Sequence, residues 1–193
     1  MDLFESSSAE LSACGRYRYL LKRVWDDKLP PYVSGMLNPS TADAEINDAT
    51  IVRNIRRAVR LGCGSLIVWN LFAFRATDPL EMKASPDPVG PDNDWWIDHA
   101  LLDCKERMGI AVAGWGVHGT FLNRAVKIAQ RAAELNVPLF CLGTTKDGHP
   151  RHPLYVGNSV ELELWHHLER LQGEGGACVD LSASGVGLAG DAK

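Results

Sequence analysis

The sequence lacks the features of several protein classes. No stretch approaches the ~18 consecutive apolar residues of a membrane span. The acidic N-terminus, MDLFESSSAE, has neither the basic nor the apolar region of a secretory signal. The five cysteines form no CxxC pair, which argues against a disulfide scaffold or a zinc module. An iron–sulfur cluster built from distant cysteines is a minor alternative. We therefore expect a reduced cytoplasmic protein with no membrane partner, no metal and no cofactor.

The common signatures of nucleotide and acyl chemistry are also missing. The chain has no Walker A, no GxGxxG and no GxSxG motif. It therefore lacks the usual signatures of NTPases, dinucleotide-binding enzymes and serine hydrolases. A basic excess is absent too, because 20 Lys and Arg face 24 Asp and Glu, a net charge of −4. This excludes a protein that coats nucleic acid. Residues 15–70 nevertheless hold nine Lys and Arg against five Asp and Glu, a local +4 that leaves room for a few phosphate contacts.

The 193 residues are enough for one domain. Hydrophobic residues make up 46% of the chain, which is ordinary for a globular protein. Residues 1–14 are small and polar, and residues 173–193 contain six glycines and no apolar period. We expect a single folded unit at 15–172, with flexible tails at 1–14 and 173–193.

Strand and helix patterns alternate along this unit. Strands are expected at 16–25, 32–37, 65–72, 110–114 and 137–142, with a short extended piece at 154–156. Helices are expected at 47–61, 92–108, 118–136 and 159–171. This alternation predicts an α/β fold: a three-layer α/β/α arrangement around a mostly parallel sheet, in an order that the pattern does not fix. Ligands of such sheets bind at the carboxyl ends of the strands.

Two asparagines stand at these strand ends. Asn38 precedes Pro39, which favours extended backbone, and its side chain could orient a water or a ligand hydroxyl. An Asx turn is the simpler alternative. Asn70 interrupts an apolar strand, and its carboxamide suits the edge of a nucleobase, although it could equally tie the strand end to a loop. Asp43 and Asp48 are candidate general bases, and Asp48 is also a good helix cap.

The segment GHPRHPLY is stiffened by prolines and carries three polar side chains. His149 or His152 could donate a hydrogen bond to a leaving base, and Arg151 could bind a phosphate. A rigid surface turn is the alternative, and the spacing makes a metal site only a minor option.

A basic stripe and a group of aromatics complete the candidates. Arg53, Arg56, Arg57 and Arg60 share one helix face and predict either a phosphate contact or a solvated face paired with carboxylates. Phe72 and Trp115 could stack a flat base, as could Trp69 and Phe74, although core packing is the common fate of such residues.

Four ordered motifs, GMLNPSTAD, NLFAFRATDP, WG and PRHPLY, cover residues 16–157. They resemble a bacterial family known only as a domain of unknown function, number 1643. More remotely, their order and spacing look like the uracil-DNA glycosylase superfamily. That likeness implies the fold of this superfamily, with Asn38 positioning the attacking water, Asn70 reading the base and His152 stabilising the departing base.

These observations give three hypotheses of function. The first is a glycosylase-like enzyme that cleaves a nucleobase N-glycosidic bond, in DNA or in a nucleotide. The second is a binding module that recognises a nucleotide or nucleic acid with the same residues and no turnover. The third is a small-molecule hydrolase unrelated to nucleic acid.

Overall fold

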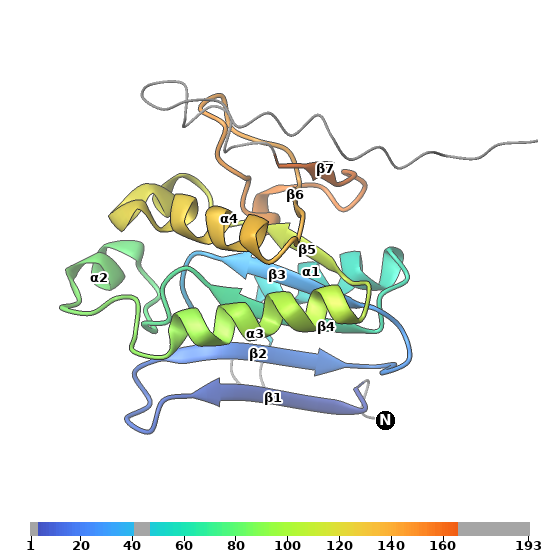
Figure 1. Ribbon diagram of the computed structural model, residues 1–193, viewed down its shortest axis with the longest axis horizontal. Helices are drawn as coiled ribbons and strands as arrows, with labels where there is room; N and C mark the ends of the chain where they lie inside the picture. Colours follow the sequence, from blue (N-terminus) through green and yellow to red (C-terminus); the bar gives the residue numbers. More distant parts are fainter. Residues whose placement is uncertain (1–3, 41–46, 166–193) are drawn as a thin grey trace, which may run out of the picture.

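The computed structural model describes residues 4–40 and 47–165 and contains one seven-stranded sheet in the order β1-β2-β4-β3-β5-β6-β7 (Figure 1). Helices pack on both faces of the sheet, which confirms the α/β class. The strands are β1 Ser6–Leu11, β2 Arg18–Val24, β3 Pro31–Met36, β4 Ser65–Asn70, β5 Ile110–Ala113, β6 Leu139–Cys141 and β7 Glu163–Leu164.

The sheet is mixed, whereas the sequence pattern predicted a mostly parallel one. Strands β4, β3, β5 and β6 run parallel in its centre. Strand β2 is antiparallel to β4, and β1 and β7 are antiparallel edge strands. Alternating apolar residues identify a strand but carry no information on its direction, so residues 16–25 were recognised as a strand without their orientation.

Strand β1 corrects the prediction that residues 1–14 form a flexible tail. Residues Ser6–Leu11 pair with β2 along their length. The segment is too polar to bury much surface, but the open edge of β2 offers it a row of backbone partners. Ala9 also packs against the apolar cluster on one face of the sheet. Backbone pairing of this kind leaves little trace in hydrophobic periodicity.

Helix α1 (Ala49–Arg60) covers one face of the sheet, packing Ile51 and Ala58 against the strands. Its start is fixed by Asp48, whose carboxylate accepts from the backbone N–H groups of Thr50 and Ile51, both at 2.9 Å. The cap explains why the predicted helix at 47–61 is confirmed. Asp48 is thereby occupied as a helix cap, and Asp43 lies outside the described residues.

Helices α3 (Asn93–Glu106) and α4 (Arg124–Glu134) cover the opposite face, in front of the sheet in Figure 1. Helix α3 confirms the prediction at 92–108. The predicted helix at 118–136 is divided into a 3-10 turn, η1 (Val117–Asn123), and α4. The break falls at Leu122 and Asn123, whose φ angles of 50° and 56° lie in the left-handed region and cannot continue a helix.

Three short elements differ from the sequence prediction. Helix α2 (Pro79–Ala84) was not predicted, since it is barely longer than one turn. Residues Pro153–Tyr155 form a 3-10 turn, η2, instead of an extended piece. The predicted helix at 159–171 is wrong where it begins, because Glu163–Leu164 pair with β6 as strand β7; its end lies outside the described residues. Within the described part of the chain, no helix has the length and apolar character needed to cross a membrane.

Candidate functional site

A cavity of about 530 Å³ lies at the carboxyl ends of the four parallel strands. Each of the loops that follow β3, β4, β5 and β6 contributes part of its wall, as expected for an α/β sheet. Its lining residues are Leu37, Asn38, Ser40, Ala76, Thr77, Pro79, Trp115, Gly116, Val117, His118, Thr145, Arg151, His152 and Tyr155. The cavity thus brings Asn38, His152, Trp115 and Arg151 together, four of the residues singled out from the sequence.

Asn38 is held in place by its amide nitrogen. Nδ2 donates to the carbonyl of Ala76 at 2.6 Å and to that of Pro39 at 3.2 Å. The amide oxygen has no hydrogen-bond partner among the described residues. The side chain therefore does more than close an Asx turn: it joins the loops after β3 and β4 and keeps an acceptor available at the cavity wall.

His152 stands as a neutral donor. Its Nδ1 accepts from the backbone N–H of Leu154 at 3.3 Å, which places the ring proton on Nε2. Burial lowers the pKa of His152, while the negative charge of Asp48 opposes this shift in pKa. The imidazole is therefore uncharged near neutral pH. Between the two histidines that the sequence left open, only His152 lines the cavity within the described residues.

Trp115 forms the inner wall of the cavity and is only 1% exposed. Its ring packs against Trp69 at 5.9 Å and edge-on against Trp165 at 5.1 Å between centroids. Gly119 has to be glycine here, since a Cβ at this position would overlap the Trp115 indole. The indole N–H is buried and has no acceptor among the described residues. A rigid aromatic side chain at the inner wall is suited to packing against a flat ligand.

Asn70 and Phe72 lie in the core, outside the lining of this cavity. The backbone carbonyl of Asn70 accepts from the Asn93 amide at 3.0 Å, which ties β4 to α3. Phe72 packs against Phe121 with 5.5 Å between ring centroids. Both residues stand at the end of an apolar strand. This position in the sequence does not predict whether a side chain faces the ligand or supports the cavity wall from behind.

The arginine stripe of α1 is mostly used inside the protein. Arg57 is 1% exposed and donates to the carbonyls of Val156 (2.6 Å), Gly157 (3.1 Å) and Pro153 (3.3 Å). Arg53 also donates to Val156, and Arg60 donates to the carbonyl of Val160. The buried guanidinium of Arg57 thus fixes the loop after His152 instead of facing a phosphate.

Arg56 and Arg151 are two exposed arginines of the predicted phosphate set. Arg56 is exposed on α1 and does not line the cavity. Arg151 is exposed at the cavity, where its Nε donates to the carbonyl of Thr144 at 3.0 Å. The two terminal nitrogens of Arg151 have no partner among the described residues. Arg151 is therefore the member of the predicted phosphate set that has both a fixed position and free donors.

His118 and Tyr155 also line the cavity and were not singled out from the sequence. The Nδ1 of His118 lies 3.2 Å from the ammonium of Lys83. Tyr155 is 84% exposed, and its ring centroid lies 5.6 Å from that of His152. Their positions carry a usable signal, because Tyr155 ends the PRHPLY motif and His118 lies just after the WG motif. Within the described residues, no cluster of three or more His, Cys, Asp or Glu is arranged to hold a metal.

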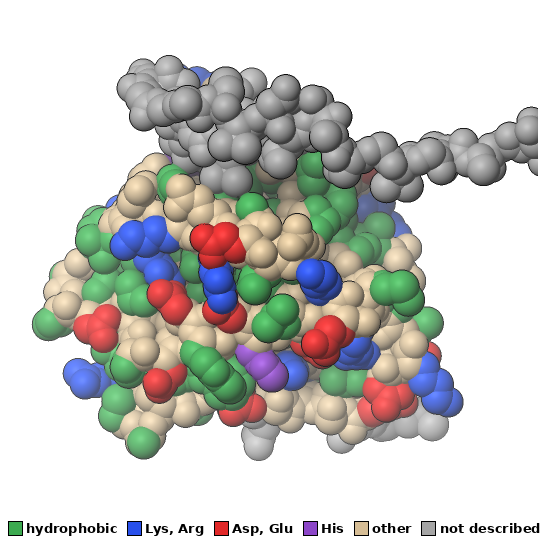
Figure 2. All heavy atoms as spheres, in the orientation of Figure 1, with side chains coloured by type: hydrophobic (Ala, Val, Ile, Leu, Met, Phe, Trp, Pro, Cys, Tyr) green, Lys and Arg blue, Asp and Glu red, His purple; other side chains and the backbone are tan. Residues whose placement is uncertain are grey.

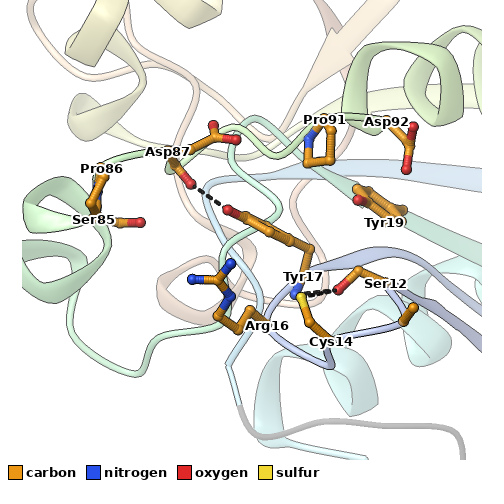
Figure 3. A pocket seen from close by; sticks show the side chains of 11 residues that line it. Ser12, Cys14, Arg16, Tyr17, Tyr19, Ser85, Pro86, Asp87, Pro91 and Asp92 are labelled. Atoms are coloured by element: carbon orange, nitrogen blue, oxygen red, sulfur yellow. Dashed lines mark hydrogen bonds between the residues drawn. The ribbon is translucent and has the colours of Figure 1, made fainter.

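A second groove, of about 570 Å³, lies near the turn between β1 and β2 (Figure 3). The Tyr17 hydroxyl donates across it to the carbonyl of Asp87 at 3.1 Å. Cys14 is exposed here and lies 3.3 Å from the Ser12 hydroxyl. That hydroxyl, with further contributions from Arg16, lowers the pKa of the Cys14 thiol to about 7. Cys63, Cys104 and Cys141 are buried, and burial raises the pKa of each.

Comparison with known proteins gives one family. The model of the family described as "Protein of unknown function (DUF1643)" matches residues 18–154. These residues include every strand from β2 to β6 and most of the cavity lining. No curated protein and no solved structure matches the chain. The protein belongs to the DUF1643 family.

Proposed function

We propose that the cavity binds a nucleobase and that the protein hydrolyses its N-glycosidic bond. The observation that carries this proposal is the convergence of Asn38 and His152, from two separate loops, on one cavity. Its volume of about 530 Å³ lies within the ~300–1,000 Å³ of typical small-molecule sites. The helices on both faces of the sheet also suit the proposed likeness to the uracil-DNA glycosylase superfamily.

The two side chains suit the two ends of the reaction. When the bond between C1′ of the sugar and the base nitrogen breaks, its electron pair stays on the base and positive charge develops on the sugar. The Nε2–H of His152 would donate to the base anion, and fixed dipoles of this kind stabilise such charge effectively. The Asn38 amide oxygen would orient a water whose oxygen bonds to C1′ and whose proton passes to solvent.

Trp115 would form the rigid inner wall of the base site. It is locked by Trp69 and Trp165, so binding costs little side-chain entropy. Asn70 would act through the wall, since it does not line the cavity.

The test is the release of a base by the full chain. The substrates are oligonucleotides with uracil, hypoxanthine, a thymine mismatch or hydroxymethylated bases, and the four common nucleoside monophosphates. We expect turnover of at least one substrate that is lost in Asn38→Ala and in His152→Ala. The matched control is His149→Ala, which should retain turnover because His149 does not line the cavity. Equal activity of the unaltered protein and its three variants, or no base release from any substrate, would contradict the proposal.

A second candidate function is binding without turnover. It is favoured by the absence of Asp and Glu from the lining among the described residues, which leaves no carboxylate there to act as a general base. In this case the nucleotide would bind, Asn38→Ala would weaken binding, and no free base would form after prolonged incubation. Detection of free base at a rate that depends on His152 would rule it out.

A further inference from the structure

We infer that the ligand of this cavity carries a phosphate monoester, bound by Arg151 and His118, and that it is a free nucleotide instead of a segment of duplex DNA. The inference rests on the proposed function, because it assumes that a nucleobase occupies the wall formed by Trp115. It adds the chemical class of the ligand and assigns the group that binds its anionic end.

Among the described residues, the lining contains one guanidinium, that of Arg151, and no carboxylate. Among the described residues, Arg151, His118 and His152 line the cavity, and Asp and Glu do not. This contrasts with a chain whose overall net charge is −4. Cationic and neutral donors with no acid between them favour an anionic ligand, because an uncompensated guanidinium gains most from a charge-assisted hydrogen bond.

The guanidinium of Arg151 is fixed at one nitrogen and leaves its two terminal nitrogens available. Its Nε is held by the carbonyl of Thr144, and its backbone N–H donates to the carbonyl of Gly143 at 3.0 Å. Prolines 150 and 153 stiffen the loop on both sides. The two terminal nitrogens are left for a bidentate acceptor, which a phosphate provides.

His118 presents a donor from the neighbouring loop, since it follows β5, and β5 pairs with β6. The Lys83 ammonium can only donate, so the Nδ1 of His118 accepts from it and the proton of the ring lies on Nε2. Lys83 itself is held over the ring of Phe121 at 5.5 Å. The pair places an Nε2–H donor and a nearby positive charge on the β5 side of the cavity.

The surroundings favour one phosphate over many. Arg53, Arg57 and Arg60 of α1 each donate to a loop carbonyl. The two exposed arginines of this helix, Arg56 and Arg60, lie outside the cavity lining. On the face that carries α3 and α4, acidic and basic side chains are intermixed (Figure 2), and Arg131 is paired there with Asp98 and Glu134. Duplex DNA is bound through several phosphates at once, and this requires a stripe of free cations.

The experiment compares matched ligands by calorimetry with the full chain. The probes are adenosine, guanosine, cytidine and uridine, their 5′-monophosphates, and a duplex oligonucleotide. We expect at least one monophosphate to bind about tenfold or more tightly than its nucleoside, with a shallow dependence on salt. Arg151→Gln and His118→Gln should each reduce that ratio, and Arg151→Lys should retain part of it. The exposed Arg56→Gln is the matched control and should leave the ratio unchanged.

The outcomes separate the two proposals. Equal binding of every nucleoside and its monophosphate, no binding of either, or tighter binding of the duplex with a steep salt dependence would overturn the inference. Base release from oligonucleotides alone would also overturn it while supporting the proposed function. Phosphate-dependent binding that needs Arg151, without base release from any substrate, would support the inference and contradict the proposed enzyme. Thermal melting of each variant shows whether a loss of binding reflects unfolding.

Discussion

Replacement of Arg57 by methionine tests whether the basic stripe of α1 is structural. Methionine retains most of the apolar stem, so the change removes the guanidinium without opening a large cavity. Three hydrogen bonds to carbonyls are lost, of which the one to Val156 at 2.6 Å is the shortest. Arg53 still donates to Val156, and exposed Gly157 can be hydrated, so the loss is less than the sum of three bonds.

From these contacts we expect the free energy of unfolding to fall by about 3 kcal/mol, since a hydrogen bond to a charged group contributes ~1.5–3 kcal/mol and the two longer bonds add little. The midpoint of thermal unfolding should then drop by about 6–12 °C, at ~2–4 °C per kcal/mol for a chain of this size. Urea titration monitored by tryptophan fluorescence measures the change directly.

Arg56→Met is the matched control, because Arg56 lies one position away on the exposed side of α1. It should change the free energy of unfolding by less than ~0.5 kcal/mol. The reasoning is refuted if Arg57→Met is as stable as Arg56→Met and yet loses nucleotide binding. That result would mean that Arg57 turns outward to the ligand and that the loop after His152 is held by other contacts.

Three further predictions concern titration and packing. Because burial lowers the pKa of His152 below its ordinary 6.5, the unfolded chain binds this proton first as the pH falls. The free energy of unfolding should therefore decrease as the pH drops through the window below 6.5. In His152→Gln, the free energy of unfolding from denaturant titrations should depend less steeply on pH in this window. An unchanged dependence on pH would refute the assignment. Cys14 should react with iodoacetamide half-maximally near pH 7, well below the other cysteines, and Arg16→Gln should move this midpoint to higher pH, as followed by mass spectrometry; a midpoint above pH 8.5 in the unaltered protein would contradict it. Gly35→Ala should destabilise the protein by about 1–3 kcal/mol in urea titration, because its Cβ would overlap the buried Trp69 indole; a neutral effect would show that the indole moves freely.

The central part of the fold could be predicted from the sequence because its signals are local. The apolar strand that contains Trp69, the cap at Asp48 and the amphipathic pattern of α1 each report on neighbouring residues. The direction of β2 and the pairing of β1 depend on contacts between distant segments. A polar segment such as Ser6–Leu11 carries no pattern that reveals an available strand edge.

The site was predictable only in part, for a related reason. The rule that ligands bind at the carboxyl ends of strands led to Asn38 and His152, which do line one cavity. The same rule could not show that Asn70 lies behind the wall, because a shift of one residue reverses the face that a strand residue occupies. It also could not show that Arg57 turns inward, since its carbonyl partners lie about 100 positions away along the chain.

A crystal structure of the protein with a nucleoside 5′-monophosphate tests the central claim most directly. The account predicts that the base lies against Trp115, between the Asn38 amide oxygen and the His152 Nε2–H, and that the phosphate contacts Arg151. A nucleotide bound outside this cavity, or bound in it with its base turned away from Asn38 and His152, would contradict the account.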